Sequence, residues 1–111
     1  MAVFVSNITI EQGFDFETTF ELENISTTEP LDLNNYSSPT AQLRKTYTSS
    51  TATDFTVQII DTNGILGVSM GATMTSALKP GRYVYDIRLL GGDKIIKIVE
   101  GSAIVRGGVT R

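Results

Sequence analysis

The chain has 111 residues, of which 41% are hydrophobic and 19% are charged, and its formal net charge is −3. This balance is typical of one globular domain with a single modest core, and it differs from the composition of disordered segments. The chain contains neither cysteine nor histidine. It therefore cannot form a disulfide or a thiolate metal site, and it lacks the commonest general base and zinc ligand.

The first ten residues, MAVFVSNITI, have no basic segment and only a short apolar run, so we expect no signal peptide. No apolar stretch approaches the roughly 20 residues that span a bilayer. We therefore expect no membrane partner, and synthesis in a reducing cytoplasm.

Charge is distributed unevenly along the chain. Up to Leu33 there are seven acidic residues and no basic one, whereas the rest of the chain has five acidic and nine basic residues. One interpretation is that this asymmetry steers partner surfaces together. The other, which we favour, is that strands from both halves interleave and the charges mix over the surface of one sandwich.

Apolar and polar residues alternate with a period of two in many segments, which predicts strands, the first over residues 3–10. The most regular alternation lies in GFDFETTFELEN. Its inward row is expected to be Phe14, Phe16, Thr18, Phe20 and Leu22. Its solvated outer row is expected to include Asp15, Glu17, Glu21 and Glu23.

Residues 25–40 are rich in Ser, Thr, Asn and Pro, which indicates a connection between sheets, with Leu31 and Leu33 returning to the core. A short strand is expected in AQLRKTY, with Ala41 and Leu43 inward, followed by the polar loop TSSTATD.

The segment FTVQIIDTNGILGVSM predicts two strands joined by a hairpin turn at Asn63-Gly64. A helical turn is expected over residues 73–78. The following Lys-Pro-Gly-Arg sequence predicts a type II turn, in which Pro80 presets φ and Gly81 takes a positive φ.

Two further strands are expected over residues 82–90 and 93–100, with their turn at Gly91-Gly92, and a last strand over residues 102–105 precedes an exposed tail. The strand over residues 93–100 is apolar on both faces, so the pattern does not assign its inward side. Seven or eight short strands predict one all-β domain, an antiparallel sandwich over residues 1–111. Its core is expected to contain Phe14, Phe16, Phe20, Leu22, Leu43, Phe55, Val57, Ile59, Tyr83, Tyr85, Ile87 and Leu89.

The acidic row is the one carboxylate cluster that the pattern offers to catalysis. Alternate residues on a strand lie roughly 6.5–7 Å apart, which suits an inverting glycosidase. Nothing in the sequence supplies the aromatic residues or the cleft of such an enzyme. A row of like charges more often solvates a strand and protects it from edge-to-edge aggregation, so we expect no enzymatic activity.

Other kinds of binding site are weakly indicated. The Asp-Thr-Asn-Gly stretch at residues 61–64 lacks the further oxygen ligands of a calcium loop, and the glycines after it lack the Lys-Ser/Thr of a phosphate-binding loop. Basic residues are scattered in a chain that is acidic overall. We therefore expect no cofactor, no metal and no nucleic-acid partner.

The stretch ALKPGRYVYDIRLL, followed by a Gly-Asp turn and the closing EGSAIVRGGVTR, resembles small immunoglobulin-like β-sandwich modules of tailed-bacteriophage virions. Those modules include the N-terminal domains of phage baseplate upper proteins. The strand GFDF, the stretch LDL and the strand AQLRKT also resemble the family, in the same order. In immunoglobulin-like folds a tyrosine at this corner bonds back to upstream backbone, and Tyr83 and Tyr85 are both candidates.

The resemblance implies a non-enzymatic structural subunit of the virion, in the tail, baseplate, neck or capsid-associated parts, present as a homo-oligomer or in a symmetric assembly. Its partners would be further copies of itself, other virion proteins, or both. The candidate assembly residues are Asp15, Glu17, Glu21, Glu23, Arg82 and Arg88. The alternative is a small carbohydrate- or ligand-binding module, for which Tyr36 and Tyr47 are the candidate exposed aromatics. A metal-dependent Asp/Glu enzyme is a third hypothesis.

Overall fold

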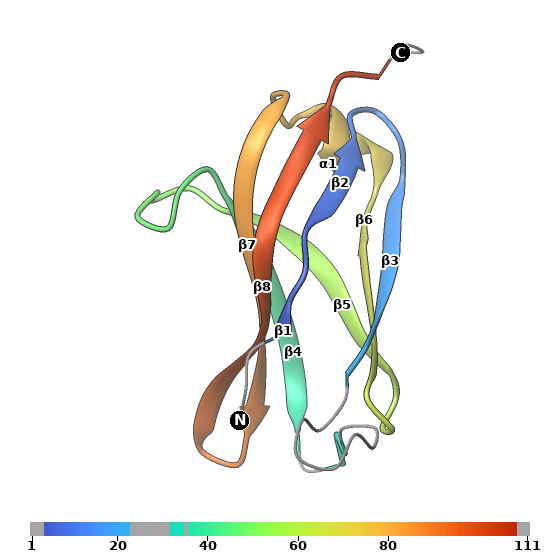
Figure 1. Ribbon diagram of the computed structural model, residues 1–111, viewed down its shortest axis with the longest axis vertical. Coiled ribbons are helices and arrows are strands. Elements are labelled where there is room, and N and C mark those ends of the chain that lie inside the picture. The colour runs from blue at the N-terminus through green and yellow to red at the C-terminus, as the bar shows by residue number, and fades with distance from the viewer. Residues whose placement is uncertain (1–3, 23–31, 35, 109–111) are drawn as a thin grey trace.

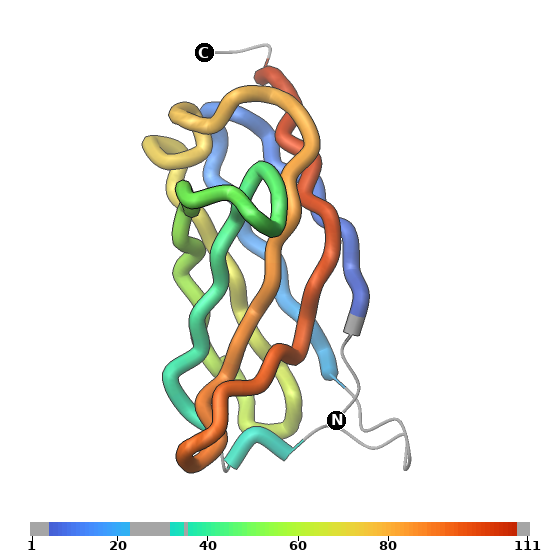
Figure 2. Tube along the Cα trace, turned by 90° about the vertical axis from the view of Figure 1, so that its left-hand side faces the viewer, coloured from blue at the N-terminus to red at the C-terminus, as the bar shows by residue number. Residues whose placement is uncertain are grey.

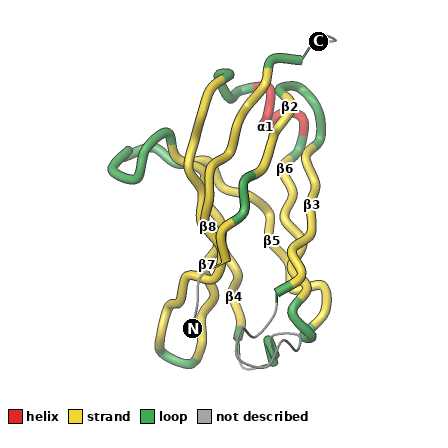
Figure 3. Tube along the Cα trace, viewed as in Figure 1, coloured by secondary structure: helices red, strands yellow, loops and turns green. Residues whose placement is uncertain are grey.

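A computed structural model describes residues 4–22, 32–34 and 36–108. They form eight strands and one short helix, drawn in Figure 1 and coloured by type in Figure 3. The elements are β1 (Phe4–Val5), β2 (Ile8–Glu11), β3 (Phe16–Glu21), β4 (Ser37–Arg44), β5 (Thr53–Asp61), β6 (Ile65–Met70), α1 (Ala72–Ser76), β7 (Gly81–Gly91) and β8 (Lys94–Arg106). The expected short helix is present, and Glu23 and Leu31 lie outside the described residues.

The strands follow the order β1-β8-β7-β4-β5-β6-β3, and β2 also pairs with β8. This path curls until it is nearly closed, so that it forms a sandwich of two layers. We call β1, β2, β8, β7 and β4 the β8 layer, and β5, β6 and β3 the β6 layer. Pairing is antiparallel except that β1 and β2 run parallel to β8. The expected all-β sandwich is confirmed, but the expectation of purely antiparallel pairing is not, because the N-terminal strands β1 and β2 lie parallel to β8.

Strand β5 joins the two layers. Its first residues, 53–55, pair with β4, and residues 56–61 pair with β6. Figure 1 shows β5 crossing diagonally from the loop at residues 45–52 to the far side of the molecule, and Figure 2 shows that loop from the side. Because β5 belongs to both layers, the strand order is continuous from β8 to β3.

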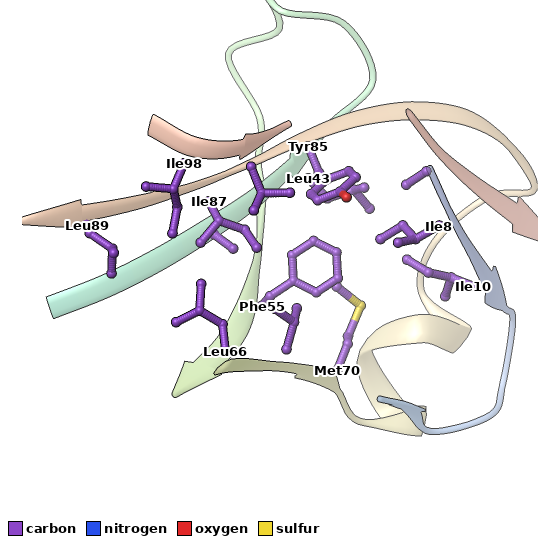
Figure 4. Packing of buried hydrophobic residues seen from close by; sticks show 14 of the residues in the cluster. Ile8, Ile10, Leu43, Phe55, Leu66, Met70, Tyr85, Ile87, Leu89 and Ile98 are labelled. Atoms are coloured by element: carbon purple, nitrogen blue, oxygen red, sulfur yellow. The ribbon is translucent and has the colours of Figure 1, made fainter. Parts of the chain in front are cut away.

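The core lies between the layers, around the ring of Phe55 (Figure 4). This ring lies 6.0 Å from the ring of Phe16 and 6.3 Å from that of Tyr85, centroid to centroid. The buried hydrophobic residues are Ile8, Ile10, Leu22, Leu33, Ala41, Leu43, Phe55, Leu66, Val68, Met70, Leu78, Tyr85, Ile87, Leu89, Ile98, Val99, Ala103 and Val105.

The expected core is confirmed in most positions. Leu22, Leu43, Phe55, Tyr85, Ile87 and Leu89 are buried, and Phe16, Phe20, Val57, Ile59 and Tyr83 pack against them while partly exposed. Phe14 was expected inward, but it is 45% exposed. The chain turns here, with φ of +86° at Gly13 and a hydrogen bond from the Phe14 amide to the Glu11 carbonyl, so the alternation begins only at Phe16.

The two apolar faces of β8 have a local cause. Ile87 pairs with Val99 and Arg88 pairs with Lys97, so Ile98 is an extra residue in a β-bulge. Ile98 and Val99 are therefore consecutive and both fully buried. The strand also continues through Gly101 to Arg106, where the pattern predicted a break.

Other strand boundaries also differ from the pattern. The expected first strand is divided into β1 and β2 at residues 6–7, and β4 begins at Ser37, inside the predicted connection. The register of β4 shifts between Ser37 and Thr40, around Pro39. A proline has no amide to give to a ladder, and it is tolerated in a strand at such a bulge.

The turns lie where expected, but with other geometries. The Asn63-Gly64 turn is a three-residue loop over residues 62–64, with φ of +95° at Gly64 and the Asn63 amide bonded to an Asp61 carboxylate oxygen at 2.9 Å. Gly81 has φ of +148°, far from the roughly +80° of a type II turn, because this residue already begins β7.

The last hairpin turns one residue later than expected, at Gly92-Asp93 with φ of +66° at Gly92. Gly91 instead ends β7, and a β-carbon there would lie 2.8 Å from the Tyr36 ring. Tyr36 therefore requires a glycine at this position.

Tyr83 closes the corner before β7. Its hydroxyl donates a hydrogen bond of 2.8 Å to the carbonyl of Lys79, four residues upstream. The Lys45 ammonium lies 4.7 Å from the centre of the Tyr83 ring, in a cation–π contact. Of the two candidate tyrosines, Tyr83 therefore has the corner role.

Tyr85 holds the N-terminal segment against β8. Its hydroxyl donates a 2.6 Å hydrogen bond to the Ser6 carbonyl, and burial raises the pKa of this phenol to about 12. Gly101 pairs with Tyr85 across the ladder, and a β-carbon on Gly101 would lie 1.8 Å from the same carbonyl oxygen. Only glycine permits this approach of two backbones.

We expect Gly101→Ala to lower the free energy of unfolding by about 3 kcal/mol, at the upper end of the range for overpacking. The added methyl group collides with backbone that cannot move without breaking the Tyr85–Ser6 hydrogen bond. Urea denaturation measures the loss. Gly107→Ala is the matched control, because its β-carbon would meet only Pro80, at 3.8 Å. Equal stability of the two variants would contradict this account.

Candidate assembly surface

The basic residues of the described chain are confined to one of the two layers and the loops beside it, whereas acidic residues lie in both. The strands of the β6 layer contain four acidic residues and no basic one: Glu17, Glu21, Asp54 and Asp61. The basic residues of the described chain lie in the β8 layer or in loops beside its strands: Arg44, Lys45, Lys79, Arg82, Arg88, Lys94, Lys97 and Arg106. The expectation that the charges mix holds for the β8 layer, where Glu11, Asp86 and Glu100 lie among the basic residues and Glu11 is 3.4 Å from Arg106. It fails for the β6 layer, because the acidic strand β3 pairs with β6 and β5 follows, and neither carries a base.

The acidic row lies on the outer face of the β6 layer. Glu17 and Glu21 are exposed, with Thr19 between them, while Phe16, Thr18 and Phe20 turn inward. Within the part of the chain that the structure describes, neither glutamate forms an ion pair.

Asp15 has a different position from the other acidic candidates. One of its carboxylate oxygens accepts a 2.8 Å hydrogen bond from the amide of Ala72, the first residue of α1. This contact uses the carboxylate to cap the helix. Glu23, the remaining candidate of the row, lies outside the described residues.

The two basic candidates lie on the outer face of the β8 layer. Arg82 and Arg88 are exposed on β7, opposite in phase to the buried Tyr85 and Ile87. Between them Asp86 is 3.7 Å from the Lys97 ammonium, which also lies 3.3 Å from Glu100. One lysine thus contacts two carboxylates, which leaves a net charge of −1 in this group, whereas neither arginine has an ion-pair partner among the described residues.

The acidic and basic candidates therefore face opposite sides of one molecule. They cannot meet within it, but the acidic face of one copy can meet the basic face of another. Such a contact uses two different surfaces and is heterologous, so repetition closes a ring or extends a filament.

A shallow depression of about 160 Å³ also lies on the outer face of β4 and β7. It is lined by Gln42, Arg44, Tyr47, Val84, Tyr85, Asp86 and Arg88. The Arg44 guanidinium donates to the Ser49 carbonyl and, at 3.1 Å, to the Gln42 amide oxygen. The ring of Tyr47 is 66% exposed at this depression, whereas Tyr36 packs against the core beside Gly91. Only Tyr47 of the two predicted aromatics is thus placed to contact a ligand.

The turn between β2 and β3 is fastened to α1 through Thr75, the one buried polar residue of the described chain. Its hydroxyl accepts from the Gly13 amide at 3.1 Å and lies 2.8 Å from the Phe14 carbonyl as a donor. The Gln12 side chain adds a 2.8 Å hydrogen bond to the Leu78 carbonyl. Together with Asp15, these contacts set where β3 begins. The sequence pattern gave no signal of them.

The described residues contain no group of three or more acidic side chains placed to hold a metal ion. None of their helices has the length and apolar character needed to cross a membrane.

Comparison with known proteins shows the fold. No protein-family model matches the chain, and no curated protein matches it. A solved structure of InlP from Listeria monocytogenes is similar, with a TM-score of 0.54 and 16% identity over 91% of this chain and 26% of that one. A family 123 glycoside hydrolase from Clostridium perfringens aligns with a TM-score of 0.43 and 14% identity over 100% of this chain and 24% of that one. The chain spans about a quarter of each of these proteins. The likeness to InlP supports the fold alone, and the second is too distant to carry an argument.

We expect Thr75→Val to lower the free energy of unfolding by about 1–3 kcal/mol, because the Gly13 amide and the Phe14 carbonyl lose their bonds to the buried Thr75 hydroxyl. Thermal or urea denaturation measures the change. Ser76→Ala is the control: its exposed hydroxyl bonds only to the Thr73 carbonyl of the same helix, so the loss should stay within about 0.5 kcal/mol. A Thr75→Val protein as stable as this control would show that the fastening contributes little.

Proposed function

We propose that this chain is a non-enzymatic structural subunit of a bacteriophage particle, located in the virion, that acts by protein–protein assembly. The sequence resemblance supplies the kind of particle. The observation that carries the assembly role is the segregation of unpaired glutamates and unpaired arginines onto opposite faces of one small sandwich.

The physical argument concerns charges that have no partner within the described molecule. Glu17 and Glu21 stand on one face, Arg82 and Arg88 on the other, and a head-to-tail contact brings the two pairs together. Complementary surfaces raise the rate of encounter and select the orientation of the contact. Charges at the rim of such a contact are screened by salt over about 10 Å at 0.1 M ionic strength. Self-association should therefore weaken as salt is added.

Charge reversal tests the contact between copies. Glu17→Lys with Glu21→Lys, and separately Arg82→Glu with Arg88→Glu, should each weaken self-association about tenfold or more, because like charges then face each other. Mixed in equal amounts, the two proteins should associate again, since the reversed acidic face of one complements the reversed basic face of the other. Sedimentation velocity at low and high salt measures both results.

Asp93→Lys serves as the control for changed net charge, because Asp93 is exposed at the tip of the last hairpin, away from both faces. This variant should associate like the unchanged protein. If both charge-reversed proteins sediment as the unchanged protein does, the head-to-tail contact is wrong. Circular dichroism should show that each variant keeps the β-sheet spectrum.

The depression at Tyr47 supports a second candidate function, a small carbohydrate- or ligand-binding module. An exposed tyrosine beside Arg44, Arg88 and Gln42 combines a stacking surface with donors for hydroxyl or carboxylate groups. A glycan array with the unchanged protein would detect such binding. Tyr47→Ala should abolish any signal, whereas Tyr36→Phe should leave it. An array without signal would dismiss this candidate.

A further inference from the structure

Strand β3 has an open edge. Among the described residues it pairs only with β6. The Leu22 amide bonds to the Gly64 carbonyl at 2.7 Å, and this contact sets the phase of the ladder. Since hydrogen-bonded pairs alternate along an antiparallel ladder, residues 16, 18 and 20 bond to β6. The amides and carbonyls of Glu17, Thr19 and Glu21 point to the open side.

Among the described residues, strand β2 also has an open edge, which faces the open edge of β3. The Ser6 amide bonds to the Glu100 carbonyl and the Gln12 amide bonds to the Arg106 carbonyl. The backbone groups of the even-numbered residues of this segment therefore point to β8. The backbone groups of Asn7, Thr9 and Glu11 are therefore directed away from β8.

A groove of about 460 Å³ runs between these two edges. It is lined by Asn7, Ile8, Thr9, Glu11, Asp15, Phe16, Glu17 and Thr18. Figure 1 shows β2 and β3 joined at the end near α1, with β3 at the rim of the β6 layer. Strand order, hydrogen-bond phase and groove together describe a sheet that lacks a strand at its seam.

A second copy of β3 is a poor occupant of this edge. If two copies of β3 pair antiparallel with Thr19 at the centre, each Glu17 lies opposite the Glu21 of the other copy. If Thr18 is at the centre, each Asp15 lies opposite the Glu21 of the other copy. Like charges that lie directly opposite in a ladder are destabilising. The acidic row thus disfavours pairing between the β3 strands of two copies, and it favours pairing with a strand that carries positive charge.

We propose that the open edge of β3 receives an extended, basic segment of another protein by β-strand addition. The inference deepens the proposed function and rests on it, since it names how a partner in the particle is held. The segment runs antiparallel to β3 and carries Lys or Arg at two positions four residues apart, opposite Glu17 and Glu21. Between them, apolar residues point into the groove beside Phe16 and Thr18. Backbone hydrogen bonds to Glu17, Thr19 and Glu21 supply the register.

The probe is a seven-residue peptide, Thr-Lys-Val-Thr-Val-Lys-Thr, with blocked ends. Titrated into the isotope-labelled full chain, it should shift the amide resonances of Glu17, Thr19 and Glu21 more than those of Phe16, Thr18 and Phe20. The same three amides should exchange with solvent more slowly when the peptide is bound. Replacing its lysines by glutamate, or methylating its central amide nitrogen, should weaken binding at least tenfold.

Thr19→Pro removes one of the three edge amides and should weaken peptide binding at least tenfold. Proline is tolerated on an edge strand whose amide faces solvent. Thr19→Val is the matched control, because it keeps the amide and should bind unchanged. Measurement on the unchanged protein does not depend on whether the proline variant folds. No binding, or equal binding of the N-methylated peptide, would overturn the proposal.

The two proposals fail in different ways. Salt-sensitive self-association that Thr19→Pro leaves intact, with no peptide bound to β3, overturns strand addition and leaves the assembly role standing. The opposite result is that the peptide binds to the β3 edge while both charge-reversed variants sediment as the unchanged protein does. This result overturns the contact between copies and supports strand addition.

Discussion

The close approach of the Ser6 carbonyl to Gly101 determines much of what this molecule presents to solvent. The missing side chain of Gly101 leaves room for that carbonyl, and the Tyr85 hydroxyl holds it. With Ser6 fixed there, β1 and β2 are committed to β8 and run parallel to it. The N-terminal segment is then unavailable to β3, and the seam between the two layers stays open. Gly101 is thus one of the features that keep the N-terminal segment on β8 and away from β3.

The separation of charge follows from strand pairing. An acidic N-terminal segment does not by itself create an acidic surface, because its neighbours in space decide whether opposite charges lie beside it. Here β3 is followed in the sheet by β6 and then by the uncharged middle of β5. The basic residues belong to strands of the other layer or to loops beside them, where three acidic residues accompany them. The acidic row of β3 therefore has no basic neighbour on its own face.

Local alternation was sufficient to predict the strands, the inward rows of β3 and β7, and the all-β class. It failed where backbone geometry interrupts the period. Phe14 precedes the strand because of the turn at Gly13, and Ile98 and Val99 are both inward because of a bulge. The parallel pairing of β2, the fastening by Thr75 and the segregation of charge depend on residues from opposite ends of the chain. No local pattern carries that information, although an isolated glycine inside an apolar strand, as at Gly101, is a signal that another backbone approaches.

The parallel pairing of β1 and β2 with β8 has a mechanical consequence. β8 ends at the upper end of the molecule, and β1 begins well below that end (Figure 1). A pull on the two terminal strands in opposite directions slides them along each other, and the hydrogen bonds between them, which run across the strands, carry the load together. A hairpin pulled at its open end separates one bond at a time. The first and last strands therefore form a shear-loaded clamp, and the sandwich resists tension along its long axis better than its small core would indicate.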